Sequence, residues 1–222
     1  MERIVVRNIV SSYGKKKVLK GVSLSAAAGE CIGIVGENGC GKSTLFNILA
    51  GLKKADSGEF FFDTGKSPAA CVGYVPQEGS LMNELSVLDN LSLWYRDRAE
   101  LRLSLKQGFL KELGVDEMCR TRVDKLSGGM KKRVSIGCAL AGNPPILILD
   151  EPDAALDLMG KAEIRGYLAK YKKQGGTILI ATHEESDLEL CDKVYALHNG
   201  KSKEIDRTLR QEALIREIKG QS

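Results

Sequence analysis

One segment constrains this chain of 222 residues more than any other, the glycine-rich run Gly36-Glu37-Asn38-Gly39-Cys40-Gly41-Lys42-Ser43-Thr44. It matches the pattern G-x-x-x-x-G-K-[ST] and lies between an expected strand, Cys31 to Val35, and an expected helix, Thr44 to Ala50. Its glycines let backbone N–H groups turn inward, and the helix that follows directs the positive end of its dipole into the same concavity. The segment therefore predicts a polyphosphate site, where Lys42 reaches the β- and γ-phosphates and the Ser43 hydroxyl binds Mg²⁺.

Charge and composition argue against nucleic acid as a partner. Lys and Arg number 33 and Asp and Glu 29, which gives a net charge of +4, and aromatic residues make up only 5% of the chain. A nucleic-acid-binding face needs concentrated basic residues with aromatic side chains for base stacking. We therefore expect no nucleic-acid partner.

The cysteines and the hydropathy pattern bear on location. The six cysteines show no C-x-x-C spacing, so they are expected to be reduced thiols in the cytosol. The N-terminus has no secretory pattern, and no apolar run approaches the length of a membrane span. The sequence predicts a chain that neither crosses a membrane nor is exported.

The stretches around the phosphate loop predict strands. Ile4 to Val10 and Val18 to Leu24 have strand composition, as do Gly58 to Asp63 and Cys71 to Val75. Tyr13, in the first turn, is either a stacking platform for a nucleotide base or an ordinary turn tyrosine. Gln77 follows the last of these strands, and its position alone indicates little.

A second helix start has the character of a phosphate site. From Val87 to about Gly114 the apolar spacing is helical, which indicates a helical insertion. Ser127-Gly128-Gly129 then opens another helix, which is expected to run to about Ala141. Its free N–H groups and dipole would favour an anion, although a serine N-cap followed by two loop glycines would look the same in isolation.

Two carboxylates follow a fully apolar strand. Ile146 to Leu149 predicts a buried parallel strand, at whose carboxyl edge ligands bind in α/β sheets. Asp150 suits Mg²⁺ binding and Glu151 suits polarising an attacking water. Asp153, close by in the chain, is expected to oppose the charge of Glu151.

The last third of the chain supplies one further candidate. The expected strand Thr177 to Ala181 leads to His183, which either meets the γ-phosphate or is structural. Lys193 to Leu197 predicts another strand. The segment Lys203 to Lys219 predicts a terminal helix with Ile205 and Ile215 among its apolar residues.

In this order the motifs resemble the ATPase domain of the ABC transporter superfamily over essentially the whole chain. Gly36 to Thr44 is similar to its Walker A motif, and Leu126-Ser127-Gly128-Gly129-Met130 to its LSGGQ signature, with Met130 in place of the usual glutamine. Further positions are similar to the A-loop aromatic (Tyr13), the Q-loop glutamine (Gln77), Walker B with its catalytic glutamate (Asp150, Glu151), the D-loop (Ala155-Leu156-Asp157) and the switch histidine (His183).

The resemblance implies an α/β fold: a P-loop NTPase core with a mainly parallel sheet, an N-terminal antiparallel β subdomain and an inserted α-helical subdomain. Residues 1–222 would form a single domain, with the helical insertion at approximately 85–142. Glu151, His183 and Gln77 would be catalytic, and Ser43, Gln77 and Asp150 would hold Mg²⁺. ATP would bind Tyr13, the residues from Gly36 to Thr44, Ser127, Gly128, Gly129 and Asp157.

The resemblance also implies partners. Two such domains, as a homodimer or heterodimer, would close head to tail on ATP and drive a separate transmembrane subunit, so that the chain would lie in the cytoplasm at the inner face of the membrane. The Leu-Ser-Gly-Gly-Met-Lys-Lys-Arg run and the short C-terminus are more similar to bacterial export-type ATPases than to sugar importers. Two alternatives stay open: a soluble ABC ATPase with cytosolic partners, and a P-loop kinase, which would leave Ser127-Gly128-Gly129 unexplained.

Overall fold

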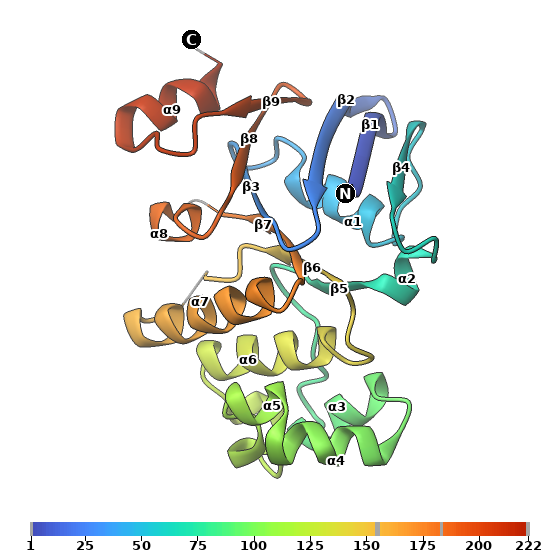
Figure 1. Cartoon of the computed structure of the whole chain (residues 1–222), viewed down its shortest axis with the longest axis vertical. Helices are drawn as coiled ribbons and strands as arrows, with labels where there is room; N and C mark the ends of the chain where they lie inside the picture. Colours follow the sequence, from blue (N-terminus) through green and yellow to red (C-terminus); the bar gives the residue numbers. More distant parts are fainter. Residues whose placement is uncertain (1, 154–155, 183, 221–222) are drawn as a thin grey trace.

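The structure is a computed structural model that describes residues 2–153, 156–182 and 184–220 (Figure 1). Its strands are β1 (Glu2–Tyr13), β2 (Lys16–Ala27), β3 (Cys31–Val35), β4 (Ser57–Phe62), β5 (Val72–Val75), β6 (Ile146–Asp150), β7 (Thr177–Ala181), β8 (Lys193–His198) and β9 (Lys201–Ile205). Its helices are α1 (Lys42–Leu49), α2 (Pro68–Cys71), α3 (Val87–Trp94), α4 (Arg98–Gln107), α5 (Phe109–Glu112), α6 (Gly128–Ala139), α7 (Leu158–Lys173), α8 (Glu185–Leu188) and α9 (Gln211–Lys219), with short 3₁₀ turns at Asp116–Met118 and Val123–Lys125.

A six-stranded sheet forms the centre, in the order β5-β6-β7-β3-β8-β9. The first five of these strands are parallel, and β9 runs antiparallel to β8. Successive side chains point to opposite faces, so β6 sends Leu147 and Leu149 into one apolar core and Ile146 and Ile148 into the other. Burial on both faces explains why the run is apolar without alternation.

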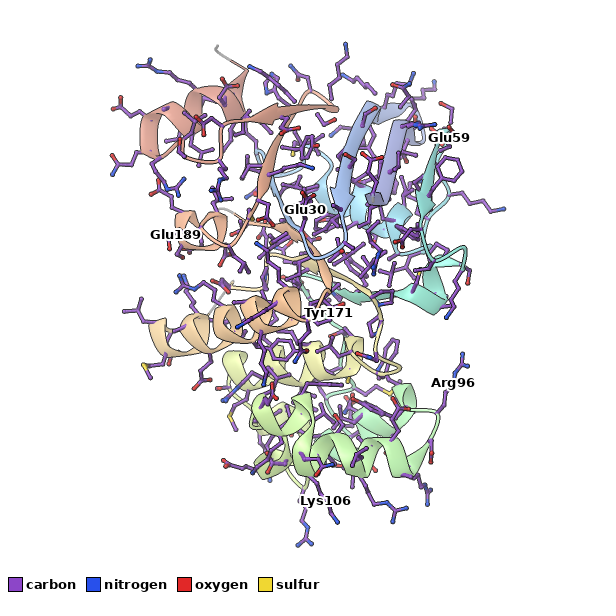
Figure 2. All side chains as sticks on the ribbon, viewed as in Figure 1. Glu30, Glu59, Arg96, Lys106, Tyr171 and Glu189 are labelled. Carbon is purple, nitrogen blue, oxygen red and sulfur yellow. The ribbon has the colours of Figure 1, made fainter. Side chains whose placement is uncertain are left out.

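The two faces of this sheet carry different layers. On one face the antiparallel sheet β2-β1-β4 and helix α1 share a core with β3, β6 and β7. On the other face α6 and α7 share a core with α3 to α5, which lie at the opposite end of the molecule from β1 and β2 (Figure 1). Tyr171 of α7 belongs to this second core and donates a hydrogen bond of 2.6 Å to the Pro144 carbonyl (Figure 2).

The sequence-based fold class is confirmed in its main parts. The central sheet is mainly parallel, the N-terminal sheet is antiparallel, and a helical segment is inserted before β6. Strands β3, β6 and β7 begin and end close to the expected residues because each is a short, fully buried apolar run. Within the described ranges, no helix combines the length and hydrophobicity needed to cross a bilayer.

The predicted terminal helix from Lys203 to Lys219 is wrong in its first half. Asn199 (φ 49°) and Gly200 (φ 78°) form a tight turn that returns the chain as β9, antiparallel to β8. The charged residues of β9 are tolerated because it is the outer strand of the sheet. The helix itself is only α9, where Leu214 is buried and Ile215 is 49% exposed.

Candidate active site

The phosphate loop joins β3 to α1, and its shape depends on glycines. A Cβ at Gly36 would lie 2.5 Å from the Leu197 carbonyl oxygen and 2.7 Å from Cys40 Sγ. Gly41 has a φ of 119°, and a Cβ there would lie 2.6 Å from a Leu19 methyl. Side chains are therefore excluded at both positions, and the backbone packs closely enough to present its N–H groups to an anion.

Lys42 is buried in the centre of this loop. Its Nζ donates to the carbonyl oxygens of Gly36 (2.8 Å) and Glu37 (3.4 Å), and it lies 3.8 Å from Glu151 Oε1. Gln77 Nε2 donates to the other carboxylate oxygen of Glu151 at 2.8 Å. Three residues predicted to act together, from three separate motifs, are thus directly linked.

Asp150 and Ser43 provide oxygen ligands for a cation. Asp150 is 2% exposed, and its Oδ1 has no hydrogen-bond partner among the described residues. Burial raises the pKa of Asp150, while the Ser43 hydroxyl and the ammonium groups of Lys42 and Lys132 oppose that change. A buried carboxylate oxygen without a donor, beside a hydroxyl, is a donor set that suits Mg²⁺, so the residues fit this ion.

A hollow of about 430 Å³ lies over the loop. Tyr13 stands at its edge, 54% exposed, with Lys53 Nζ 4.5 Å from the centre of its ring. This exposed face can stack on a base. Half of the residues predicted to bind ATP line the hollow, together with Gln77 and Glu151. Its lining consists of Tyr13, Val18, Asn38, Gly39, Gly41, Lys42, Ser43, Thr44, Gln77 and Glu151.

The signature residues do not line this hollow. Ser127 is exposed at the start of α6 and accepts a hydrogen bond from the Met130 N–H at 3.3 Å. A Cβ at Gly129 would lie 3.5 Å from a methyl group of Leu156, so the signature and the segment leading into α7 are neighbours. Asp157 caps α7 by accepting from the Gly160 N–H at 2.8 Å. These residues, with Gly128, form a second surface.

Two predictions about the site are not confirmed, one because its residues are not described and one because the neighbour differs. His183 and Ala155 lie outside the described residues. Asp153 is buried, and its main charged neighbour is Asp187 rather than the expected Glu151.

Lys132 is a residue that the sequence reasoning missed. Its Nζ lies 3.5 Å from the Pro76 carbonyl oxygen. Burial lowers the pKa of Lys132, whereas Asp150, Asp153 and Glu151 each act to raise it. The helical spacing could have indicated that Lys132 is buried, because it lies on the same face of α6 as Ser135 and Ile136.

The fold and the site define a P-loop domain that binds a nucleotide. The model of the family described as ABC transporter matches residues 19–154, and the chain belongs to that family. The linearmycin resistance ATP-binding protein LnrL of Bacillus subtilis is 34% identical over 203 residues, which are 87% of this chain and 65% of LnrL. The lipopolysaccharide export system ATP-binding protein LptB of Escherichia coli is 32% identical over 213 residues, which are 90% of this chain and 88% of LptB.

Solved structures agree with this assignment. The chain superimposes with a TM-score of 0.80 and 28% identity on the dimeric, post-hydrolysis ATP-binding cassette MJ0796 bound to ADP and Pi, covering 93% of this chain and all of that one. The relatives also include proteins named for import, such as sulfonate import protein SsuB of Cupriavidus necator. The chain spans just under two thirds of the length of the curated relatives LnrL and SsuB.

Proposed function

We propose that the chain is the ATP-hydrolysing subunit of an ABC transporter, which closes with a second ATPase domain around ATP and drives a separate transmembrane subunit. The observation that carries the proposal is where the N-termini of helices α1 and α6, the two expected phosphate-binding elements, lie in the fold. The hollow over Lys42 holds one of them, while Ser127 and Gly128 are exposed on another surface. Each would complete an ATP site only with the opposite element of another domain.

The residues of the hollow suit hydrolysis. Lys42 and the loop N–H groups would offset the charge of the β- and γ-phosphates, and the ring of Tyr13 would stack on the base. Glu151 would orient and polarise the attacking water, with Gln77 holding its carboxylate. Mg²⁺, held by Ser43 and Asp150 with Gln77 near it, would neutralise phosphate charge when bound. His183 is proposed to meet the γ-phosphate, from its similarity to the switch histidine.

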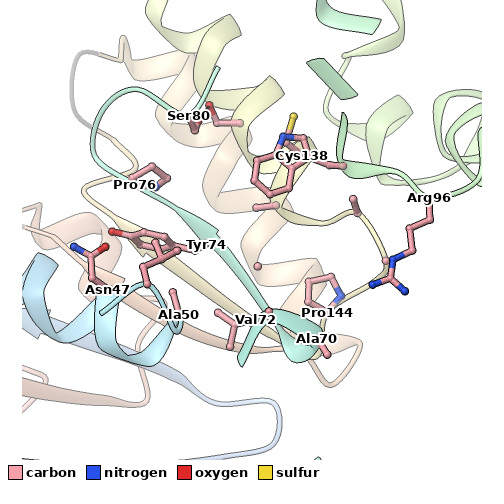
Figure 3. A pocket seen from close by; sticks show the side chains of 18 of the residues that line it. Asn47, Ala50, Ala70, Val72, Tyr74, Pro76, Ser80, Arg96, Cys138 and Pro144 are labelled. Carbon is pink, nitrogen blue, oxygen red and sulfur yellow. Dashed lines mark hydrogen bonds between the residues drawn. The ribbon is translucent and has the colours of Figure 1, made fainter. Parts of the chain in front are cut away.

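A separate groove of about 900 Å³ supports coupling to a partner. It lies between β5, α6 and the connection from α3 to α4 (Figure 3). Tyr74 and Pro76 line one part of it and Arg96 and Pro144 another. Trp94 also lines the groove, and it is 55% exposed. An apolar groove with few charges fits a short helix of a membrane subunit. The chain between Gln77 and the groove would link ATP to that partner.

We assign the direction of transport to export. The similarity to LptB extends over 88% of that protein, which is named for lipopolysaccharide export, and the LSGGMKKR run is similar to export-type ATPases. In this proposal the chain lies on the cytoplasmic face of the membrane, attached through its partner.

The test is an affinity capture with the Glu151→Gln variant and ATP from detergent-solubilised membranes. Blocked hydrolysis should hold the closed dimer on its partner. A multi-spanning protein identified by mass spectrometry, and lost when Trp94→Glu is added, is the expected result. Recovery of soluble proteins alone, with the bait absent from membranes, would overturn the transporter role in favour of a cytosolic module.

A further inference from the structure

Two buried carboxyl groups outside the nucleotide hollow, Asp153 and Asp187, lie within reach of a direct side-chain interaction with each other. Asp153 follows β6 and is 4% exposed, and Asp187 on α8 is 1% exposed. Both oxygens of Asp153 and the Oδ1 of Asp187 have no hydrogen-bond partner among the described residues. Two ionised carboxylates in this arrangement would repel each other in a poorly solvated site, whereas one proton between them would convert the repulsion into a hydrogen bond.

The surrounding charges do not remove the need for this proton. From α7, Lys161 and Arg165 act to lower the Asp153 pKa, but Lys161 Nζ is already 2.8 Å from Glu184 Oε1. On α6, the Lys132 ammonium interacts electrostatically with Asp150 and Glu151 as well as with Asp153, so it does not compensate Asp153 alone. Burial and the Asp187 carboxyl outweigh these cations and raise the Asp153 pKa to about 7.

The pair joins two segments that border the active site. Asp187 Oδ2 accepts from Thr182 Oγ1 at 2.6 Å, and Thr182 Oγ1 accepts from the Glu184 N–H at 3.0 Å. Thr182 directly follows β7, and Asp153 is two residues beyond Glu151. The Glu151 backbone has a φ of 49°, which is uncommon for a residue with a side chain. Its position therefore depends on how the turn after β6 is held.

We propose that Asp153 and Asp187 share one proton, and that this shared proton fixes the turn that positions Glu151 for hydrolysis. The inference rests on the role proposed above for Glu151, while the shared proton itself does not. When the proton is lost to water, both carboxylates carry a negative charge. Their repulsion then moves the turn after β6 away from the segment after β7. Asp153 is then a positioning residue whose protonation makes hydrolysis sensitive to pH near neutrality.

The first arm of the test measures the shared proton without ATP. Denaturant unfolding of the full chain is compared across pH 4 to 8 for the wild type, Asp153→Asn and the exposed control Asp56→Asn. The folded state holds a proton that the unfolded chain releases above its ordinary carboxyl pKa of 3.8. The wild-type unfolding constant should therefore rise, relative to Asp153→Asn, by close to tenfold per pH unit between about pH 4 and 7. The control should follow the wild type, and parallel curves for all three proteins would overturn the proposal.

The second arm measures positioning. Wild-type ATPase should fall toward tenfold per pH unit above about pH 7, with ATP affinity unchanged, because only the protonated pair holds the turn. Asp153→Asn and Asp153→Thr keep a group that can donate to Asp187 without ionising, so both should retain activity to higher pH. If that alkaline limb persists in both variants, Asp153 does not position Glu151. A chain without ATPase activity would contradict the proposed function and leave the unfolding arm to decide on the proton.

Discussion

In the absence of nucleotide, Glu151 is expected to compete with ATP for Lys42. The Glu151 Oε1 lies 3.8 Å from Lys42 Nζ, and the side chains are 18% and 5% exposed. At this separation an effective dielectric constant near 20 gives an attraction of about 4 kcal/mol. This attraction is an upper limit on the free energy that ATP binding gains when Glu151 is replaced. Lys42 keeps its hydrogen bonds to the loop carbonyls in the variant, so its charge stays partly compensated.

The Glu151→Gln variant should therefore bind ATP more tightly. If between a quarter and a half of the attraction between Glu151 and Lys42 becomes available to ATP, ATP binding strengthens by about 1 to 2 kcal/mol. This change lowers the Kd for ATP about 5- to 30-fold. Hydrolysis should fall by about 10²- to 10⁴-fold, since the group that polarises the water is lost.

Calorimetry or a fluorescent ATP analogue measures this change, at protein concentrations where light scattering shows a monomer. The monomer condition matters because a trapped dimer would also appear as tighter binding. Gln77→Ala is the matched control, since it breaks the 2.8 Å hydrogen bond to Glu151 but leaves the carboxylate beside Lys42. Equal ATP affinity in monomeric wild type and Glu151→Gln would refute the competition.

The remaining predictions concern the loop, the base, the core and the groove. Gly36→Ala should abolish ATP binding while the circular dichroism spectrum stays folded, because its Cβ would lie 2.5 Å from the Leu197 carbonyl oxygen. Tyr13→Ala should weaken ATP binding by about 1–3 kcal/mol in a titration and Tyr13→Phe by much less, since stacking needs the ring and not the hydroxyl. Ile148→Ala should lower the free energy of unfolding by about 2–5 kcal/mol in urea, because the side chain is fully buried in the core under the central sheet. Trp94→Glu should reduce recovery of the membrane partner, and undiminished recovery would place the partner elsewhere than the groove.

Elements whose local sequence is compatible with only one type of secondary structure were predicted well. The run Ile146 to Leu149 had to be buried on both faces, and the phosphate loop had to join a strand to a helix, so β6 and the connection from β3 to α1 followed from local patterns. The role of Gln77 came from the order of motifs in the family and not from its local sequence, and the structure shows that it donates a hydrogen bond to Glu151.

Contacts between distant residues were not available from those patterns. Asp153 and Asp187 are far apart in the chain, and only the parallel pairing of β6 with β7 brings the segments after them together. The strand β9 was not predicted because its charged residues are equally compatible with the exposed face of a helix. The feature that makes it a strand is the two-residue turn at Asn199 and Gly200, which reverses the chain and pairs β9 with β8.

The central claim, that each ATP site is shared between two domains, is tested most directly by mixing two inactive variants. Lys42→Ala spoils the phosphate loop and Ser127→Arg spoils the signature, so each homodimer should lack ATPase activity. A head-to-tail heterodimer of the two would contain one site built from an intact loop and an intact signature. The account predicts that ATPase activity reappears on mixing, whereas a mixture as inactive as its components would contradict it.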